Sequence, residues 1–228
     1  MFRALDVAQC DVILKVQPRF FVLEIVANVM DVDNGNAVEE IYDKLSPAYH
    51  IHAKVLRAAT FGDPSNRTRL FVIGFLKSSV GDIGSQFYWP VPEFNSQHYY
   101  CARDVAVPDD QVPSEYWLDD SPTSFWNQNV HPLQIQVLAS CGPGMGHSSK
   151  PHKFQGWDGI FPTQTTHNGG GHRVPLDWVP GQPITYTRLT TPVETVRIAS
   201  LPQCYEGWVR SFKNDDKFLR QCVNNGVP

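Results

Sequence analysis

The sequence predicts an α/β fold, namely the second half of a doubly wound, Rossmann-like sheet with an inserted, mostly β region. Three observations predict it. Within residues 1–77, the periodicities follow the order helix, strand, helix, strand, strand. Within 78–182, helical periodicity is absent and prolines separate short aromatic patches. Within 183–228, helical signals return, so the chain divides into three regions.

The first region begins with an amphipathic helix over residues 1–16, followed by a strand over 20–26. Apolar residues on one side predict a second helix over 37–45, and strict alternation predicts a half-buried strand over 51–55. Residues 70–75 are apolar and rich in β-forming side chains, which is typical of a buried central strand. The apolar side of the first helix is predicted to contain Phe2, Leu5, Val12, Ile13 and Val16.

Charged residues lie at the ends of two of these strands. Glu24 lies where the first strand leaves the core, and Arg67 and Arg69 lie on the loop that leads into the 70–75 strand. If the two strands are neighbours, a carboxylate and a guanidinium meet at one rim of the sheet, where open α/β sheets bind ligands. The alternative is a structural ion pair between Glu24 and Arg69, and these residues alone leave both readings open.

Two glycine-rich segments lie in the middle region. Residues 133–138 predict a strand, and a G-x-G-x-G pattern follows at 142–146. A nucleotide-binding turn would open a helix, whereas residues 147–151 are typical of a loop, so a glycine-rich hairpin is the better interpretation. The second segment follows a threonine-rich strand, and it either forms a flexible hairpin tip or brings the backbone close to a ligand. It consists of Gly169, Gly170 and Gly171.

Composition limits the function classes. A hydrophobic content of 42% and an aromatic content of 12% are typical of a globular protein. No window reaches the length of a membrane span and the start lacks the layout of a signal peptide, so we expect an intracellular protein with no membrane partner. The five cysteines form no CxxC pair, and His50 and His52 lack ligand spacing, so no metal site is predicted.

The formal net charge of −4 argues mildly against a general nucleic-acid binder, because phosphate contacts need clustered Lys and Arg. A protein that grips DNA through one cleft can nevertheless be acidic overall. Charge alone therefore does not decide between these classes.

Four segments resemble motifs of the DNA cytosine-5 methyltransferases, in the order in which that family has them. PRFFVLEIV (18–26) resembles the family's P…ENV motif, and RTRLFVIG (67–74) resembles its QxRxR…IG motif. RLTTPVETVR with Leu201-Pro202 (188–202) resembles RxLTpREcaR…P, and QCVNNGVP (221–228) resembles the closing GNxVP. Each motif is weak alone, whereas four in the family's order are jointly a strong signal. The resemblance covers about 18–77 and 160–228, and the middle only by position.

The resemblance implies both the fold and the activity. The chain would be the second half of an S-adenosylmethionine-dependent methyltransferase sheet: 1–77 a partial catalytic domain, 78–182 the target-recognition region, and 183–228 a return to the catalytic domain. The family acts on double-stranded DNA, in DNA methylation and restriction-modification. It flips a cytosine out of the duplex, adds a cysteine thiolate to carbon 6, and transfers a methyl group from S-adenosylmethionine to carbon 5. The compartment would be a prokaryotic or virus-infected cytoplasm, or a nucleus.

The resemblance also assigns roles to residues. Glu24 would support the ring at nitrogen 3, Arg69 would hold the carbonyl oxygen of the base and the glutamate, and Arg67 would fix the loop or the backbone. Asn225 belongs to the closing motif, which lies near the cofactor. The residues expected to approach DNA are Gly169, Gly170, Gly171 and Arg188.

Three positions depart from the family's motifs, and two of its segments are missing. Ile25 stands where the family has asparagine, Ser65 where it has glutamine, and Asn224 where it has glycine, so the geometry at each of these positions is open. The family's FxGxG cofactor loop and PCQ nucleophile loop both precede the glutamate segment, whereas 23 residues precede Glu24 here. We therefore expect an incomplete cofactor pocket and no activity from the isolated chain.

Neither candidate nucleophile fits the PCQ pattern. Cys10 lies between Gln9 and Asp11 within a helical pattern, and Cys141 lies beside the glycine-rich hairpin with no preceding proline. Three explanations stay open: the C-terminal piece of a methyltransferase, one subunit of a split enzyme completed by a second polypeptide, or a catalytically inactive relative that binds DNA or a partner.

The intact Glu24, Arg67 and Arg69 favour the two enzyme explanations over the inactive one. Two classes outside the family fit less well. A Rossmann-type oxidoreductase would need a dinucleotide turn that opens a helix. A carbohydrate- or protein-binding β-domain would explain the aromatic middle, but it would leave the order of the motifs a coincidence.

Overall fold

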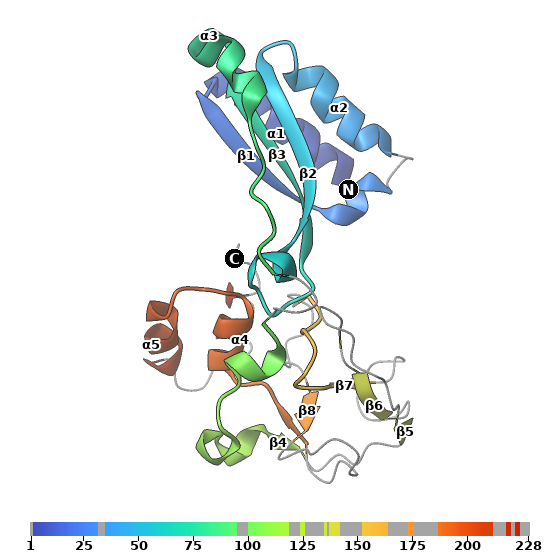
Figure 1. Cartoon of the computed structure of the whole chain (residues 1–228), viewed down its shortest axis with the longest axis vertical. Helices are drawn as coiled ribbons and strands as arrows, with labels where there is room; N and C mark the ends of the chain where they lie inside the picture. Colours follow the sequence, from blue (N-terminus) through green and yellow to red (C-terminus); the bar gives the residue numbers. More distant parts are fainter. Residues whose placement is uncertain are drawn as a thin grey trace. The chain divides into compact units, whose positions relative to one another are not determined.

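The structure is a computed structural model that describes residues 2–31, 35–94, 100–118, 124–125, 135, 137–141, 152–163, 173–175, 187–211, 218–219 and 222–223. The chain forms two compact units (Figure 1). Unit 1 comprises Met1–Arg57 and Thr68–Val91, and unit 2 comprises Ala58–Arg67 and Pro92–Pro228. The loop between two strands of unit 1 therefore belongs to unit 2.

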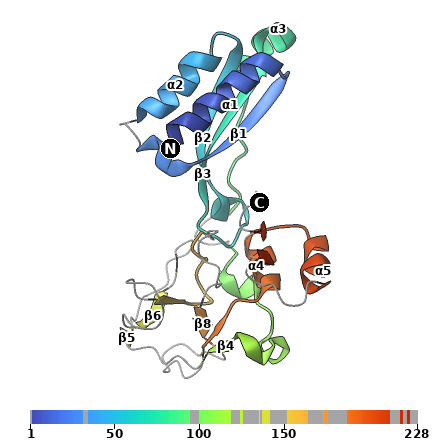
Figure 2. The same ribbon diagram turned by 180° about the vertical axis from the view of Figure 1, so that it is seen from behind.

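Unit 1 is a three-stranded antiparallel sheet in the order β1-β3-β2. Its strands are β1 (Phe20–Val26), β2 (Tyr49–Arg57) and β3 (Thr68–Leu76). The helices α1 (Phe2–Val16) and α2 (Asn36–Leu45) cover the same face of this sheet (Figure 2). The predicted order of elements is confirmed, and the 70–75 segment is the central strand.

The helix-covered face is apolar because alternate residues of each strand point to it. The buried cluster beneath the helices takes two residues from β1, three from β3 and one from β2, namely Phe21, Ile25, Leu70, Val72, Leu76 and Tyr49. The rings of Phe21 and Tyr49 meet edge to face, with 5.1 Å between their centroids. Gly74 lies opposite Phe21, and a Cβ at Gly74 would overlap the Phe21 ring, so only glycine allows this packing.

The apolar side predicted for α1 is wrong in part. The structure buries Cys10 and Ile13, whereas Val12 and Val16 are exposed. An α-helix turns about 100° per residue, so Cys10 and Ile13 lie on one side of α1, while Val12 and Val16 lie together on the adjacent side. The side chains of residues 2–7 lie outside the described part of the structure, so the places predicted for Phe2 and Leu5 are not tested.

The second face of the sheet is partly covered beside β2. After β3, the chain forms the short helix α3 (Lys77–Val80) and the 3-10 segment η4 (Gly81–Gln86). His50 Nε2 lies 2.9 Å from the carbonyl oxygen of Gly81, and His52 Nε2 lies 2.8 Å from that of Gly84. The ring of Phe87 packs on His52, with 5.2 Å between the centroids. These contacts hold the segment against β2.

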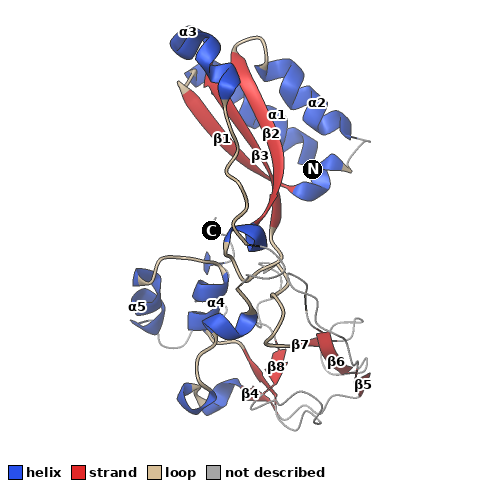
Figure 3. Ribbon diagram, in the orientation of Figure 1, coloured by secondary structure: helices blue, strands red, loops and turns tan. Residues whose placement is uncertain are grey.

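The described strands of unit 2 are short (Figure 3). Its sheet has the order β4-β9-β8-β7-β6-β5, and within it β7 and β8 are parallel while the other pairs are antiparallel. The strands are β4 (Trp117–Leu118), β5 (Ser124–Phe125), β6 (Val137–Cys141), β7 (His152–Gln155), β8 (Arg173–Pro175) and β9 (Thr187–Leu189). With unit 1, this confirms the α/β class with a mostly β region.

The helices of unit 2 follow its last strand. They are α4 (Pro192–Ile198) and α5 (Cys204–Ser211). Thr191 and Glu194 form a capping box at the start of α4, and Pro192 occupies its first turn. These two helices confirm the return of helical signals predicted within 183–228.

A buried cluster joins the C-terminal segments to the residues that precede β4. It consists of Val107, Val112, Val193, Val196, Val209, Leu219 and Val223. Compact packing therefore groups 183–228 with much of 78–182 in unit 2. The functional division at 77 and 182 stays a prediction. Among the residues described, no helix is both long and apolar enough to cross a bilayer.

Candidate functional site

Glu24 of β1 and Arg69 of β3 form an ion pair at one end of the unit 1 sheet. Glu24 Oε1 lies 3.1 Å from Arg69 Nε. The register pairs Glu24 with Phe71 and Val26 with Arg69, so the two charged side chains are diagonal neighbours on the same face. The Arg69 guanidinium also donates from Nη1 to the carbonyl oxygen of Thr68, at 2.9 Å. The sequence thus predicted this meeting of carboxylate and guanidinium correctly.

The pair is neither fully buried nor open to water. The Glu24 and Arg69 side chains keep 16% and 17% of their exposure. Partial burial strengthens the electrostatic interaction relative to water, while part of each side chain stays accessible. A pair in this position can therefore stabilise the sheet, and it can also meet a polar ligand.

Arg67 lies in the loop Ala58–Arg67 of unit 2, and its carbonyl oxygen accepts a hydrogen bond from Ala58 N at 2.8 Å. The buried Phe161 anchors the loop from a second segment. Phe161 N donates to Pro64 O at 2.7 Å, and Asn66 N donates to Phe161 O at 2.7 Å. The backbone just before Arg67 is thus held by a segment almost 100 residues later.

Asp63 stiffens the same loop from inside. Its side chain is buried, and Oδ1 accepts a hydrogen bond of 2.7 Å from Ser65 N, two residues later. Burial raises the pKa of Asp63 above its ordinary value, although polar contacts with Ser65 and Ser200 and the charge of Arg67 act in the opposite direction. The turn before Arg67 therefore depends on a buried carboxyl group.

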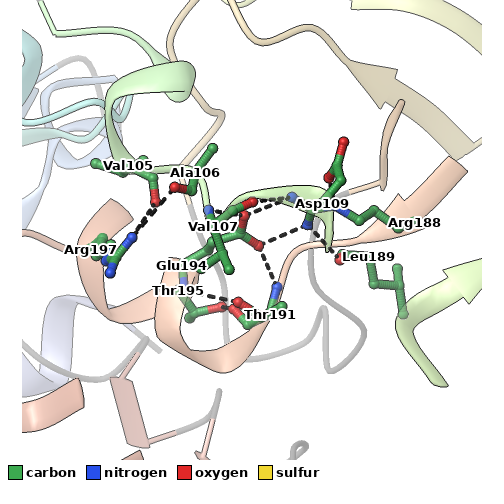
Figure 4. Close-up of polar contacts among 10 residues, drawn as sticks. All are labelled: Val105, Ala106, Val107, Asp109, Arg188, Leu189, Thr191, Glu194, Thr195 and Arg197. Atoms are coloured by element: carbon green, nitrogen blue, oxygen red, sulfur yellow. Dashed lines mark hydrogen bonds and ion pairs between the residues drawn. The ribbon is translucent and has the colours of Figure 1, made fainter. Parts of the chain in front are cut away.

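Arg188 is at the centre of a polar network in unit 2 (Figure 4). Its Nη1 and Nη2 donate to the two carboxylate oxygens of Glu194 at 2.9 and 2.8 Å, and its Nε donates to Asp109 Oδ1 at 2.7 Å. Nη1 and Nη2 also donate to the carbonyl oxygens of Leu189 and Val107. The guanidinium carbon lies 5.1 Å from the centroid of the buried Trp157 ring.

Both carboxylate oxygens of Glu194 also accept hydrogen bonds from the backbone. Its Oε1 accepts from Val107 N at 2.8 Å, and its Oε2 accepts from Thr191 N at 2.6 Å. Burial acts to lower the pKa of Arg188, but the hydrogen bonds and charges of Glu194 and Asp109 outweigh it, so the pKa is raised. The cation is therefore stable in its buried position.

This geometry corrects the expectation that Arg188 approaches DNA. Its side chain has no exposed surface, and its donors are directed at protein acceptors. A phosphate or base could reach it only if the network opened. Arg188 therefore connects β9 to α4 and to the segment around Asp109, and it acts on any DNA surface only through these elements.

Several predicted site residues lie outside the described residues, namely Asn225, Gly169, Gly170 and Gly171. The glycine-rich hairpin predicted at 142–146 also lies outside them. In the fully described parts of unit 1, no glycine-rich turn joins a strand to a helix, so these residues do not fit the adenosyl group of S-adenosylmethionine. Among the described side chains, no group of three or more His, Cys, Asp or Glu could hold a metal ion.

Three residues that the structure places at these sites were not predicted from the sequence. Asp63, Asp109 and Trp157 have no recognisable motif, and their partners are more than 30 residues away or depend on turns. One signal was available for Asp63: the Asp63-Pro64-Ser65 sequence is typical of a side chain that bonds its own backbone two residues later. For Asp109 and Trp157 no local signal exists.

The comparison with protein-family models gives one match, which extends over nearly the whole chain. The model described as C-5 cytosine-specific DNA methylase matches residues 4–228.

Two curated relatives illustrate the similarity. The chain is 29% identical over 163 residues to the type II methyltransferase M.Bsp6I of Bacillus sp. (strain RFL6), which is 70% of this chain and 48% of that protein. It is 26% identical over 205 residues to the type II methyltransferase M.HhaI of Haemophilus parahaemolyticus, which is 88% of this chain and 58% of that protein. The chain therefore spans about half the length of the curated relatives it matches.

A solved structure supports the fold. The crystal structure of the S. pombe Dnmt2 methyltransferase superposes with a TM-score of 0.54 at 13% sequence identity, covering 92% of this chain and 63% of that one. At this identity the superposition shows a shared fold and no more.

Proposed function

Because the chain belongs to the C-5 cytosine-specific DNA methylase family, we propose that it is part of a DNA cytosine-5 methyltransferase. The observation that supports this function most directly is the partly exposed Glu24–Arg69 pair, formed by the two motif segments on adjacent strands. Its substrate is a cytosine flipped out of double-stranded DNA. The donor of the methyl group is S-adenosylmethionine.

Glu24 and Arg69 act on the cytosine ring. The protonated Glu24 carboxyl group donates a hydrogen bond to nitrogen 3, and the Arg69 guanidinium donates to the carbonyl oxygen of the base. Both contacts draw electron density out of the ring, so carbon 6 becomes a better target for a thiolate. The two side chains already lie beside each other on adjacent strands, so one base can meet both.

Arg67 has a supporting role. It follows the turn that Asp63 and Phe161 hold, and it lies two residues before Arg69. A fixed turn limits the conformations of Arg67, so its charge can contact the DNA backbone or stiffen the loop at little entropic cost. Region 78–182 reads the target, with Gly169, Gly170 and Gly171 near the duplex, and Asn225 lies near the cofactor.

The cysteine nucleophile and the cofactor loop come from sequence beyond these 228 residues, either in the same longer protein or in a second polypeptide, because the chain spans about half the length of its relatives. Residues 183–228 return to the catalytic domain that this additional sequence completes.

The experiment measures transfer of a labelled methyl group from S-adenosylmethionine to cytosine in duplex DNA. The 228-residue chain is assayed alone and together with the polypeptide encoded directly upstream of it. We expect transfer only by the pair. Glu24→Gln should reduce the rate by about 100-fold or more, because it removes a group that acts on the reacting ring. Glu39→Gln, an exposed position of α2, is the matched control and should leave the rate unchanged.

Each outcome separates the alternatives. Transfer by the lone chain would contradict the need for additional sequence that carries the nucleophile and the cofactor loop. Equal rates for the Glu24→Gln and Glu39→Gln variants would remove Glu24 from the reaction. Binding of duplex DNA without transfer by the pair would favour the catalytically inactive relative.

A further inference from the structure

The loop before Arg67 contains a carboxyl group that the proposed mechanism does not use. Asp63 is only 6% exposed, and its Oδ1 accepts the hydrogen bond from Ser65 N at 2.7 Å. The second oxygen, Oδ2, is buried and has no hydrogen-bond partner among the described residues. The turn therefore uses one oxygen of Asp63 and leaves the other without a donor.

A carboxylate in this position lowers the stability of the fold. Taking a charged group out of water is costly unless hydrogen bonds satisfy its polar atoms. An asparagine side chain would accept the same hydrogen bond from Ser65 N and would carry no charge. The structure of the turn alone therefore does not explain why position 63 carries a carboxyl group.

Backbone hydrogen bonds hold Asp63 and Arg67 at the same residue of the loop. Asp63 N donates to Ala58 O at 3.2 Å, and Ala58 N donates to Arg67 O at 2.8 Å. All three residues belong to unit 2. The positive charge of Arg67 acts on the Asp63 carboxyl group, and an electrostatic interaction is mutual. The closed loop thus keeps a buried negative charge near the Arg67 guanidinium.

A second unfavourable feature lies at the same point. Ser200 follows α4 and has a φ of 50°, in the left-handed region that favours glycine. Its backbone N donates to Arg197 O at 3.0 Å, and its side chain is a polar neighbour of the Asp63 carboxyl group. Backbone strain of this kind persists where the surrounding structure imposes it, and it is concentrated at functional sites. Two features that lower stability therefore meet at Asp63.

We propose that Asp63 is a positioning residue for methyl transfer, whose buried carboxylate orients the Arg67 guanidinium at a cost in stability. The inference rests on the proposed function, in which Arg67 has a supporting role. It adds the residue that sets where Arg67 points. Asp63 acts through Arg67 rather than on the cytosine. Residues that lower stability but serve the reaction are a known feature of enzyme sites.

The test compares rate and stability in the same variants. The chain, combined with the polypeptide encoded directly upstream, is assayed for methyl transfer at saturating duplex DNA, and urea unfolding is measured on the chain. Asp63→Asn should raise stability and lower kcat by about tenfold, because a small displacement of a positioned group slows a reaction steeply. Asp43→Asn, at an exposed position of α2, removes the same charge and should change neither quantity.

A double-mutant cycle tests the route through Arg67. Arg67→Gln removes the group that Asp63 orients, so Asp63→Asn should change kcat less than twofold in this background. An equal loss in both backgrounds would overturn the proposal, because Asp63 would then act independently of Arg67. So would an unchanged kcat in Asp63→Asn, or a fall in stability that parallels the fall in rate, since either result would leave Asp63 a structural residue.

A measurement on the chain alone does not depend on catalysis. Carbon-13 NMR of the carboxyl groups follows the titration of Asp63, and Arg67→Gln should raise the pKa of Asp63 further because it removes a nearby positive charge. An unchanged pKa would overturn the proposal, because the two charges would not interact. A raised pKa with no transfer by the wild-type complex would contradict the proposed function and leave the orientation of Arg67 by Asp63 standing.

Discussion

Two Arg–Glu pairs, one in each unit, lie in different environments. Glu24 and Arg69 are joined by one ion-pair contact of 3.1 Å, and both side chains keep about a sixth of their exposure. Glu194 and Arg188 are joined by two hydrogen bonds of 2.8 and 2.9 Å, and neither side chain is more than 1% exposed. The same two residue types therefore occupy two different positions relative to the solvent.

The difference shows what separates a structural ion pair from a candidate functional one: in the structural pair, protein groups occupy the hydrogen-bonding positions of both side chains. Around Arg188 and Glu194, backbone groups and Asp109 use the hydrogen-bonding capacity of the pair, which leaves a ligand no way in without disrupting unit 2. Glu24 and Arg69 can meet a polar ligand where they are. The identity of a residue in a motif does not reveal this difference, since both Arg69 and Arg188 were predicted to be functional residues from the sequence.

The largest expected effect is at the buried pair. Glu194→Gln removes one charge and leaves the Arg188 cation buried beside a neutral amide. Breaking a buried pair costs about 3–5 kcal/mol, because the remaining charge is not compensated. Urea unfolding of the full chain should therefore show a loss of this size. A loss below about 1 kcal/mol would mean that Asp109 and the carbonyl groups suffice for Arg188.

An intermediate effect of opposite sign is expected at Asp63. Its pKa is raised by burial, so the ionised form destabilises the folded state. Asp63→Asn keeps an acceptor for Ser65 N and removes the charge, and it should stabilise the chain at pH 7 by about 1 kcal/mol, which is typical of such substitutions.

The pH dependence gives the sign of this prediction. A group with a raised pKa contributes stability that is present below about pH 4 and is lost as the pH rises through the folded-state pKa. The advantage of Asp63→Asn should therefore shrink as the pH falls toward 4. Thermal unfolding from pH 4 to pH 8 checks it, and a constant difference would mean that Asp63 does not titrate in this range.

The smallest effect on stability is expected at the partly exposed pair. Glu24→Gln should change the free energy of unfolding by less than about 1 kcal/mol, because partly solvated ion pairs contribute little. Measured beside Glu194→Gln, this variant tests the comparison directly. Equal losses at the two positions would contradict the distinction between them.

Much of unit 1 could be predicted from the sequence. Strands 20–26, 51–55 and 70–75 have local signals of alternation or a continuous apolar run, and Pro18 marks the end of the first helix. The apolar side of α1 was predicted only in part, because Ile13 is buried as expected while Val12 and Val16 are exposed and Cys10 is buried in their place. Local pattern predicts that an element exists more reliably than it predicts what the element packs against.

The sequence predicted the residues of the candidate site but not the contacts that surround them. The meeting of Glu24 and Arg69 followed from the assumption that their strands are neighbours, and the register bears this out. The loop before Arg67 was not foreseen as a fixed element, because its anchor, Phe161, lies almost 100 residues away. The burial of Arg188 was missed for the same reason, since Asp109 and Trp157 come from distant segments.

The sequence by itself determined the family, the order of the elements in unit 1 and the residues of the candidate site, because motif letters and hydrophobic periods are local properties. The tertiary structure decided which charged residues have their hydrogen-bonding groups occupied inside the protein. It also decided which edge strand of the unit 1 sheet is left without a covering segment among the described residues. Both depend on contacts between segments far apart in the chain, and burial is a property of those contacts rather than of any residue type.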